Sequence, residues 1–129
     1  MSKIVLLIED NPLMSENISE LLELRGYKVV NAHDGKKGLL LLCEAKPDLV
    51  LCDVIMPQVD GFTVLHEKKK MDGKASIPFI FMTAKAEKSD IQRGMKMGAD
   101  GYLTKPFSEK ELFSLIEVVM QKKQSSGSD

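Results

Sequence analysis

Short apolar runs alternate along the chain with stretches in which apolar residues recur at helical spacing. Five apolar runs are present, at Ile4–Ile8, Val29–Val30, Leu49–Cys52, Ile77–Met82 and, more weakly, Tyr102–Leu103. The first, third and fourth are continuously apolar and rich in Val, Ile and Leu, which is typical of strands buried on both faces of a parallel sheet. The pattern therefore predicts five short strands.

Helix signals fill the segments that follow these strands. Five helices are predicted, from Asn11-Pro12 to just before Gly26, from Asp34 through Leu42, from Asp60-Gly61 to about Met71, from about Glu87 to Met97, and along a stripe from Leu112 to Met120. Asn and Asp are favourable N-terminal caps, and Ser108 with Glu111 has the spacing of a capping box. Alternating strands and helices indicate an α/β fold, a doubly wound five-stranded parallel sheet with helices on both faces.

Length and composition limit the classes of protein to consider. With 129 residues, 43% of them hydrophobic and 29% charged, the chain has the profile of a single globular domain. Its formal net charge of −1 lacks the basic excess of most nucleic-acid-binding proteins, so direct nucleic-acid binding is not expected. No apolar run approaches the ~20 residues that span a bilayer, and the N-terminus has no signal-peptide pattern, so neither membrane insertion nor secretion is expected.

Cysteine usage and the C-terminal segment complete the general picture. Cys43 and Cys52 lack the spacing of a metal site and have apolar neighbours, which predicts buried, reduced thiols in a cytoplasmic protein. The segment from Gln121 to Asp129 is polar and has no apolar anchor. We expect one domain over residues 1–122 and a flexible tail or truncated linker over residues 123–129.

Chemically versatile residues follow four of the five predicted strands. In a doubly wound sheet, ligands bind beyond the carboxyl ends of the strands. Glu9 and Asp10 follow the first strand, Asp53 the third, Thr83 the fourth and Lys105 the fifth. Each alone is compatible with a helix cap, a turn residue or a surface charge, but their convergence on one sheet edge indicates a functional site.

The composition of this set favours phosphoryl transfer. Clustered carboxylates repel one another unless a cation intervenes, and oxygen ligands suit a hard divalent ion such as Mg²⁺. A metal ion, a lysine and a hydroxyl group are recurring parts of phosphoryl-transfer sites, in which an aspartate can be the nucleophile. The sequence contains neither GxxxxGKS/T nor GxGxxG. We therefore expect the phosphoryl group to come from a donor protein or small molecule, and not from a bound nucleotide.

In combination, these motifs resemble the response-regulator receiver domain, the CheY-like family of two-component signalling. The resemblance extends from about residue 3 to residue 122 and rests on Glu9-Asp10, Asp53–Pro57 with Asp60-Gly61, Thr83-Ala84 and Gly98–Pro106. It implies a flavodoxin-like (βα)5 fold with strand order 2-1-3-4-5. It also implies a signalling switch and not an enzyme, because such a domain catalyses only its own phosphorylation and dephosphorylation.

The same resemblance implies a phosphoacceptor and a metal site. Asp53 would accept the phosphoryl group. Asp10, Asp53 and the backbone carbonyl of Ile55 would bind Mg²⁺ directly, and Glu9 would act mainly through a bound water.

Further residues would hold the phosphoryl group and report its presence. By the resemblance, Lys105, the Thr83 hydroxyl and the backbone N–H of Ala84 would contact the phosphoryl oxygens. The peptide bond before Pro106 is cis in the family, a form that proline permits at little cost. Thr83 and Tyr102 would form the switch, with Tyr102 turning inward when Thr83 moves toward the site.

The resemblance also implies partners, and two other functions remain as alternatives. A histidine kinase or phosphotransfer protein would supply the phosphoryl group, and a downstream protein would bind the face of the fourth helix, fifth strand and fifth helix. The domain would be a monomer or a phosphorylation-dependent dimer. The alternatives are a haloacid-dehalogenase-like hydrolase, which usually has a DxD pair where this chain has Glu9-Asp10-Asn11, and a pseudo-receiver that only binds partners.

Two other features are interpreted as structural. The run Lys68–Lys70 on the third predicted helix is expected to be a solvated face. His33 and His66 are expected to lie outside the site.

Overall fold

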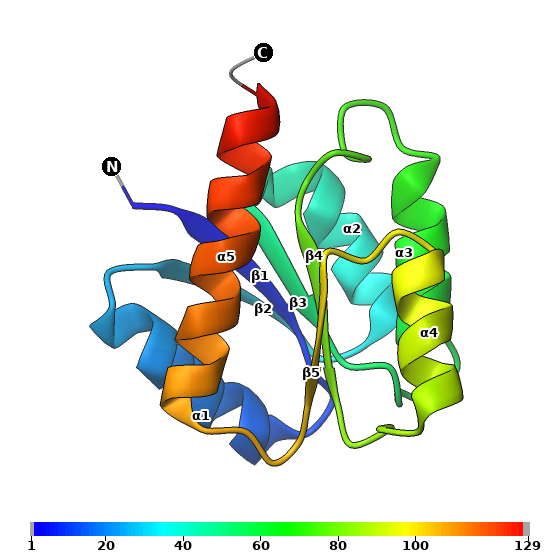
Figure 1. The fold of residues 1–129 in the computed structure, drawn as a ribbon, viewed down its shortest axis with the longest axis horizontal. Helices are drawn as coiled ribbons and strands as arrows, with labels where there is room; N and C mark the ends of the chain where they lie inside the picture. The colour runs from blue at the N-terminus through cyan, green and yellow to red at the C-terminus, as the bar shows by residue number, and fades with distance from the viewer. Residues whose placement is uncertain (1, 128–129) are drawn as a thin grey trace.

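A computed structural model describes residues 2–127, with side chains described up to Lys123. Strands and helices alternate along it in the order β1 (Ile4–Ile8), α1 (Pro12–Leu24), β2 (Lys28–Ala32), α2 (Gly35–Ala45), β3 (Leu49–Cys52), α3 (Gly61–Lys69), β4 (Phe79–Thr83), α4 (Lys88–Lys96), β5 (Gly101–Thr104) and α5 (Glu109–Gly127). The strands form one parallel sheet in the order β2-β1-β3-β4-β5 (Figure 1). The predicted fold class and strand order are confirmed.

Helices cover both faces of the sheet, which explains why the central strands are apolar throughout. Successive side chains of a strand point to opposite faces. In β1, Val5 and Leu7 pack in a core with residues of α1 and α5, whereas Leu6 and Ile8 pack in a second core with residues of α2 and α3. Figure 1 shows the same layers, with α1 and α5 on one side of the sheet and α2, α3 and α4 on the other.

The predicted helix caps are present and determine where the helices begin. Asn11, Asp34 and Asp60 each accept a hydrogen bond from the backbone N–H three residues later, at 3.0, 2.6 and 2.8 Å. Ser108 and Glu111 form the reciprocal pair of a capping box, with both N–H···O distances at 3.0 Å. These caps pair N–H groups that a helix leaves without internal partners.

Two element boundaries differ from the sequence prediction. β4 begins at Phe79 and not at Ile77, because Pro78 has no N–H to donate to a sheet ladder. α5 continues to Gly127, so residues 123–127, which were expected in a flexible tail, are helical. The reason is that Gln and Lys are good helix formers and no proline interrupts them. Residues 128 and 129 lie outside the described part of the chain, and the assignment of this segment as a linker stays a prediction.

The two cysteines have different environments. Cys52 is buried in β3, as predicted, and burial raises the pKa of its thiol well above the usual value. The prediction was wrong for Cys43, which is exposed on α2. Its neighbour Leu42 is 1% exposed, and one residue further along a helix turns the side chain about 100° away from the core.

The predicted solvated lysine run contains one buried member. Lys68 is 2% exposed, because it shares a helix face with the buried residues Val64 and Leu65. Its Nζ donates a hydrogen bond to the backbone carbonyl of Ala75 at 2.9 Å. Burial lowers the pKa of Lys68 to about 8, although the nearby Asp100 carboxylate opposes this shift.

Replacing Lys68 with Met is expected to change how stability depends on pH. The unfolded chain keeps this proton up to the ordinary lysine pKa of 10.5, whereas the folded protein releases it near 8. The wild type should therefore gain about 2 kcal/mol relative to Lys68→Met as the pH rises from 8 to 10. Urea unfolding at several pH values measures this difference. The exposed Lys69→Met variant is the control, and a gap that does not vary with pH would contradict the prediction.

Candidate functional site

The five residues predicted from strand ends lie together at the carboxyl edge of the sheet. Glu9 is 1% exposed and Asp53 is 6% exposed, and Thr83 is fully buried at the end of β4. Asp10, by contrast, is exposed at the start of the β1–α1 connection. The fifth residue follows β5 in the pair Lys105-Pro106, whose peptide bond is cis. Parallel strands bring these residues together because all of their carboxyl ends meet at the same edge.

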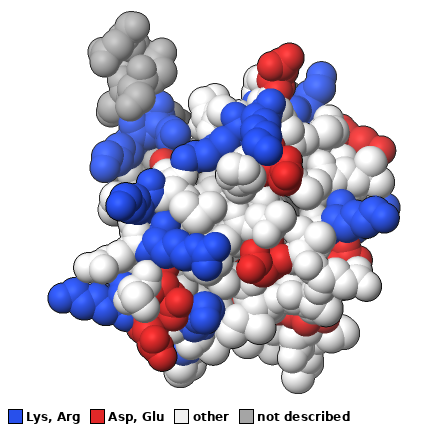
Figure 2. All heavy atoms as spheres, turned by 90° about the vertical axis from the view of Figure 1, so that its right-hand side faces the viewer, with Lys and Arg blue, Asp and Glu red and all other residues white. Residues whose placement is uncertain are grey.

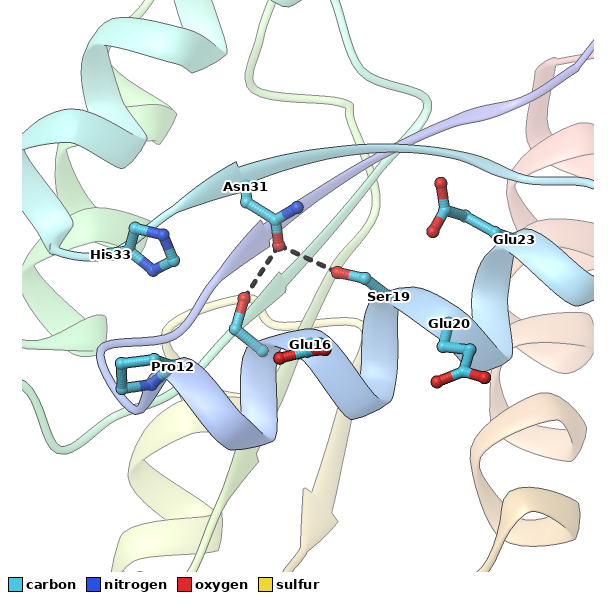
Figure 3. Close-up of a pocket in the computed structure, with 8 residues that line it drawn as sticks. Pro12, Glu16, Ser19, Glu20, Glu23, Asn31 and His33 are labelled. Carbon is cyan, nitrogen blue, oxygen red and sulfur yellow. Dashed lines mark hydrogen bonds between the residues drawn. The ribbon is translucent and has the colours of Figure 1, made fainter.

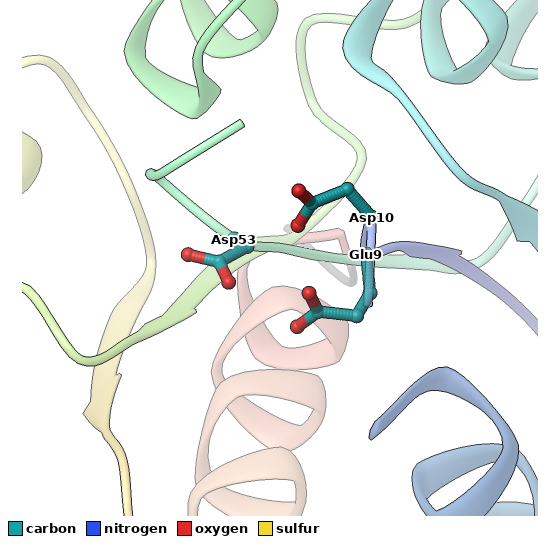
Figure 4. A group of neighbouring side chains, drawn as sticks. All are labelled: Glu9, Asp10 and Asp53. Carbon is teal, nitrogen blue, oxygen red and sulfur yellow. The ribbon is translucent and has the colours of Figure 1, made fainter. Parts of the chain in front are cut away.

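Three carboxylates form the acidic part of the site. Glu9, Asp10 and Asp53 each place one carboxylate oxygen within 4.8 Å of the others. Figure 4 shows the three carboxyl groups around a common space, two from the end of β1 and one from the end of β3. A cluster built only of oxygen ligands fits a hard divalent cation better than a soft one.

Lys105 bridges the two buried carboxylates. Its Nζ lies 2.6 Å from Oε1 of Glu9 and 2.8 Å from Oδ2 of Asp53. The other oxygen of Asp53, Oδ1, accepts a hydrogen bond from the backbone N–H of Ile55 at 3.0 Å. Oε2 of Glu9 accepts one from the N–H of Asn11 at 3.2 Å. Both buried carboxyl groups are therefore oriented by donors on two sides.

The pKa directions follow from this arrangement. Burial raises the pKa of Glu9, and the neighbouring Asp53 carboxylate adds to the increase, although hydrogen bonds from Lys105 and Asn11 oppose it. Burial on its own lowers the pKa of Lys105, but the hydrogen bonds to Asp53 and Glu9 outweigh it, so the net shift is upward. Lys105 thus remains a cation at neutral pH and offsets part of the carboxylate charge.

A chain of hydrogen bonds connects Thr83 with Tyr102. Oγ1 of Thr83 accepts from the backbone N–H of Lys85 at 3.1 Å, and the Tyr102 hydroxyl donates to the Lys85 carbonyl at 2.6 Å. Burial raises the pKa of Tyr102 to about 12, with smaller contributions from Asp90 and Asp53. The β4–α4 loop therefore links the end of β4 with the aromatic side chain of β5.

The β3–α3 loop is shaped by Gly61. A Cβ at this position would collide with the backbone carbonyl oxygen of Asp53, so only glycine lets α3 approach the end of β3 this closely. The N–H of Gly61 donates to the Val54 carbonyl at 2.9 Å, which fixes the loop. The sequence prediction placed Asp60-Gly61 at a helix start without detecting this contact.

A polar surface hollow of about 450 Å³ lies beside the site, between α1 and β2. Figure 3 shows its floor, where the Asn31 side chain faces α1. Oδ1 of Asn31 accepts hydrogen bonds from the hydroxyls of Ser15 and Ser19 at 2.8 and 2.9 Å, so these groups tie β2 to α1. His33 lies at its edge, with Nδ1 3.4 Å from the carbonyl oxygen of Glu9 and no part in the carboxylate cluster.

The sequence matches a known family over most of its length. Residues 5–117 match the family described as the response regulator receiver domain. The chain belongs to the response regulator receiver domain family. This receiver domain is a phosphoacceptor signalling switch of two-component systems, in which response regulators work with histidine kinases and downstream effectors. Within residues 2–127, no helix is long and apolar enough to cross a membrane.

Curated relatives of the receiver domain are longer proteins. It is 38% identical over 118 residues to the DNA-binding dual master transcriptional regulator RpaA of Synechocystis sp., covering 92% of this chain and 49% of that protein. It is 42% identical to the transcriptional regulatory protein RprY of Bacteroides fragilis, with the same coverage of both chains. The chain therefore spans about half the length of these relatives.

Solved structures of similar sequence share the fold of the receiver domain. The chemotaxis protein CheY4 of Vibrio cholerae superposes with a TM-score of 0.87 at 28% identity, covering 92% of this chain and 99% of that chain. A response regulator receiver domain protein from Clostridium thermocellum superposes with a TM-score of 0.87 at 30% identity, covering 95% and 97%.

Proposed function

We propose that Asp53 is the phosphoacceptor of this receiver domain. The observation that carries the proposal is the position of its carboxylate, held between the Lys105 ammonium at 2.8 Å and the Ile55 N–H at 3.0 Å, beside two further carboxylates. A carboxylate that is oriented on both sides is prepared for attack in one direction.

The proposed reaction is a transfer from the phosphodonor to Asp53. A carboxylate oxygen of Asp53 forms a bond to phosphorus while the bond from phosphorus to the donor's leaving atom breaks, and the leaving group takes the electron pair. Lys105 stabilises negative charge on the phosphoryl oxygens, with Thr83 and the N–H of Ala84 as further donors. In the reverse direction, water attacks phosphorus and releases the Asp53 carboxylate. The domain catalyses these two steps on itself.

The acidic cluster is the proposed binding site for Mg²⁺. Asp10, Asp53 and the Ile55 carbonyl would bind the ion directly, and the buried Glu9 would act through a water. The only ligands on offer are oxygens, which supports a hard cation. When bound, Mg²⁺ neutralises charge that otherwise repels an incoming phosphoryl group.

Thr83 and Tyr102 are the proposed switch. If the Thr83 hydroxyl turns to a phosphoryl oxygen, it gives up the hydrogen bond from the Lys85 N–H, and the β4–α4 loop loses one of its two anchors. Tyr102 bonds to the same residue of that loop, so its position is expected to change with it. The face of α4, β5 and α5 would carry this change to a downstream protein.

The proposed setting is a cytoplasmic signalling pathway. A histidine kinase or phosphotransfer protein would be the donor, and the domain would act as a monomer or a phosphorylation-dependent dimer without contacting nucleic acid itself. Intact-mass measurement with acetyl phosphate, with and without Mg²⁺, tests the proposal. We expect one added phosphoryl group, formed faster with Mg²⁺ and located on Asp53 by peptide mapping. A group located on another residue would refute it.

A further inference from the structure

A second hollow, of about 320 Å³, opens next to the proposed phosphoacceptor between the β3–α3 loop and α4. Ile55, Met56 and Phe62 contribute an apolar wall, and Lys85 and Arg93 contribute two cationic groups. Ile55 is 56% exposed, so this wall is open to solvent. The hollow thus combines an apolar surface with positive charge.

Backbone contacts connect both walls of this hollow to the site. Ile55 lies two residues after Asp53, and its N–H binds Oδ1 of Asp53. Lys85 lies two residues after Thr83, and its N–H binds the Thr83 hydroxyl. A molecule that presents a phosphoryl group to Asp53 can therefore extend its remaining part toward the hollow.

Arg93 is oriented within this hollow. Its guanidinium carbon lies 4.1 Å from the centre of the Phe62 ring, a cation–π contact that limits the side chain to few orientations. Among side chains described up to residue 123, no carboxylate lies within 4.0 Å of this guanidinium, whereas Lys85 is paired with Asp90 at 3.4 Å. The N–H groups of Arg93 are therefore free of a carboxylate partner. On the side of the molecule that carries α3 and α4, basic side chains also outnumber acidic ones (Figure 2).

We propose that this hollow binds the anionic leaving group of a small acyl phosphate, with Arg93 as the residue that selects such donors. The inference rests on the proposed role of Asp53. As the oxygen of Asp53 bonds to phosphorus, the bond between phosphorus and the acyl oxygen breaks, and its electron pair remains on the leaving carboxylate. No proton is needed. Arg93 and Lys85 then face the new negative charge, and the apolar wall faces the acyl carbon chain.

A comparison of two phosphodonors tests this inference in the whole chain with Mg²⁺. Acetyl phosphate releases an anionic carboxylate, whereas phosphoramidate releases neutral ammonia after protonation. For Arg93→Gln we expect a roughly 5-fold lower rate with acetyl phosphate and less than a twofold change with phosphoramidate. Lys85→Gln should change in the same direction but less, since Asp90 already shares its charge. Lys96→Gln, on the same helix and outside the hollow, is the matched control.

Three results would count against the subsite. Equal losses with both donors in Arg93→Gln would indicate a general charge effect, as would an equal loss with acetyl phosphate in Lys96→Gln. Unchanged rates with acetyl phosphate in both hollow variants would show that the hollow takes no part. A wild-type protein that neither donor phosphorylates at Asp53 would instead refute the proposed function, so the two failures are distinguishable. Circular dichroism of each variant checks that α4 remains folded.

Discussion

Asp53→Asn is expected to abolish phosphorylation while leaving the protein folded. Asparagine has nearly the same shape, so the hydrogen bond from the Ile55 N–H to the side-chain oxygen can remain. Its amide nitrogen is not a nucleophile, and the variant lacks the carboxylate oxygen that would bond to phosphorus. Incubation with acetyl phosphate and Mg²⁺, followed by intact-mass measurement, should detect no added phosphoryl group.

The Asp60→Asn variant is a matched control for this loss. Asp60 caps α3 in the neighbouring loop, and asparagine is an equally good N-terminal cap, so phosphorylation should continue at the wild-type rate. Thermal unfolding separates loss of chemistry from loss of fold. Because Asp53→Asn removes one of three clustered carboxylates, we expect its melting temperature to equal or exceed that of the wild type. Phosphorylation of Asp53→Asn at a wild-type rate would refute the assignment.

Lys105→Met is expected to slow phosphorylation by about 100- to 1,000-fold, the usual cost of removing one donor that stabilises transition-state charge. The physical reason is the position of the ammonium group, 2.8 Å from Asp53, where it would meet the phosphoryl oxygens. Methionine keeps much of the side-chain length without the charge. The rate constant with acetyl phosphate measures the effect, and the exposed Lys110→Met variant controls for loss of one positive charge.

The same variant should have a distinctive pH dependence of stability. Without Lys105, the buried Glu9 loses the hydrogen bond that opposes the increase in its pKa. The folded variant then binds a proton at Glu9 more strongly than the unfolded chain does, so it gains stability relative to the wild type as the pH falls from 7 toward 5. Urea unfolding at the two pH values tests this. A stability gap that widens at low pH would contradict the assigned electrostatics.

Local sequence signals predicted most of the architecture because they report on local physics. A run such as Leu49–Cys52 is apolar throughout because helices cover both faces of β3. Asn11, Asp34 and Asp60 predicted helix starts because a short polar side chain reaches the N–H three residues later. The site residues were predicted by one further step, since a parallel sheet places the ends of its strands at one edge.

Other properties depended on contacts between segments that are distant in sequence. Lys68 belongs to a run of three lysines, and only the packing of α3 against the sheet shows that this one is buried. The bond from Tyr102 to the Lys85 carbonyl joins residues 17 positions apart. Arg93 was not recognised from the sequence, because nothing near it along the chain indicates that Phe62 lies beneath its guanidinium.

The sequence by itself determined the order of elements, the caps and the set of groups available for chemistry, because apolar periodicity and capping act over a few residues. Only the tertiary structure decided which of those groups meet and in what state of charge. Burial raises the pKa of Glu9, and its contact with Lys105 spans 96 positions of the chain. Such distances and desolvation costs exist only once the sheet has assembled, which is why the 2.6 Å bridge between these two residues could be expected as a convergence but not as a geometry.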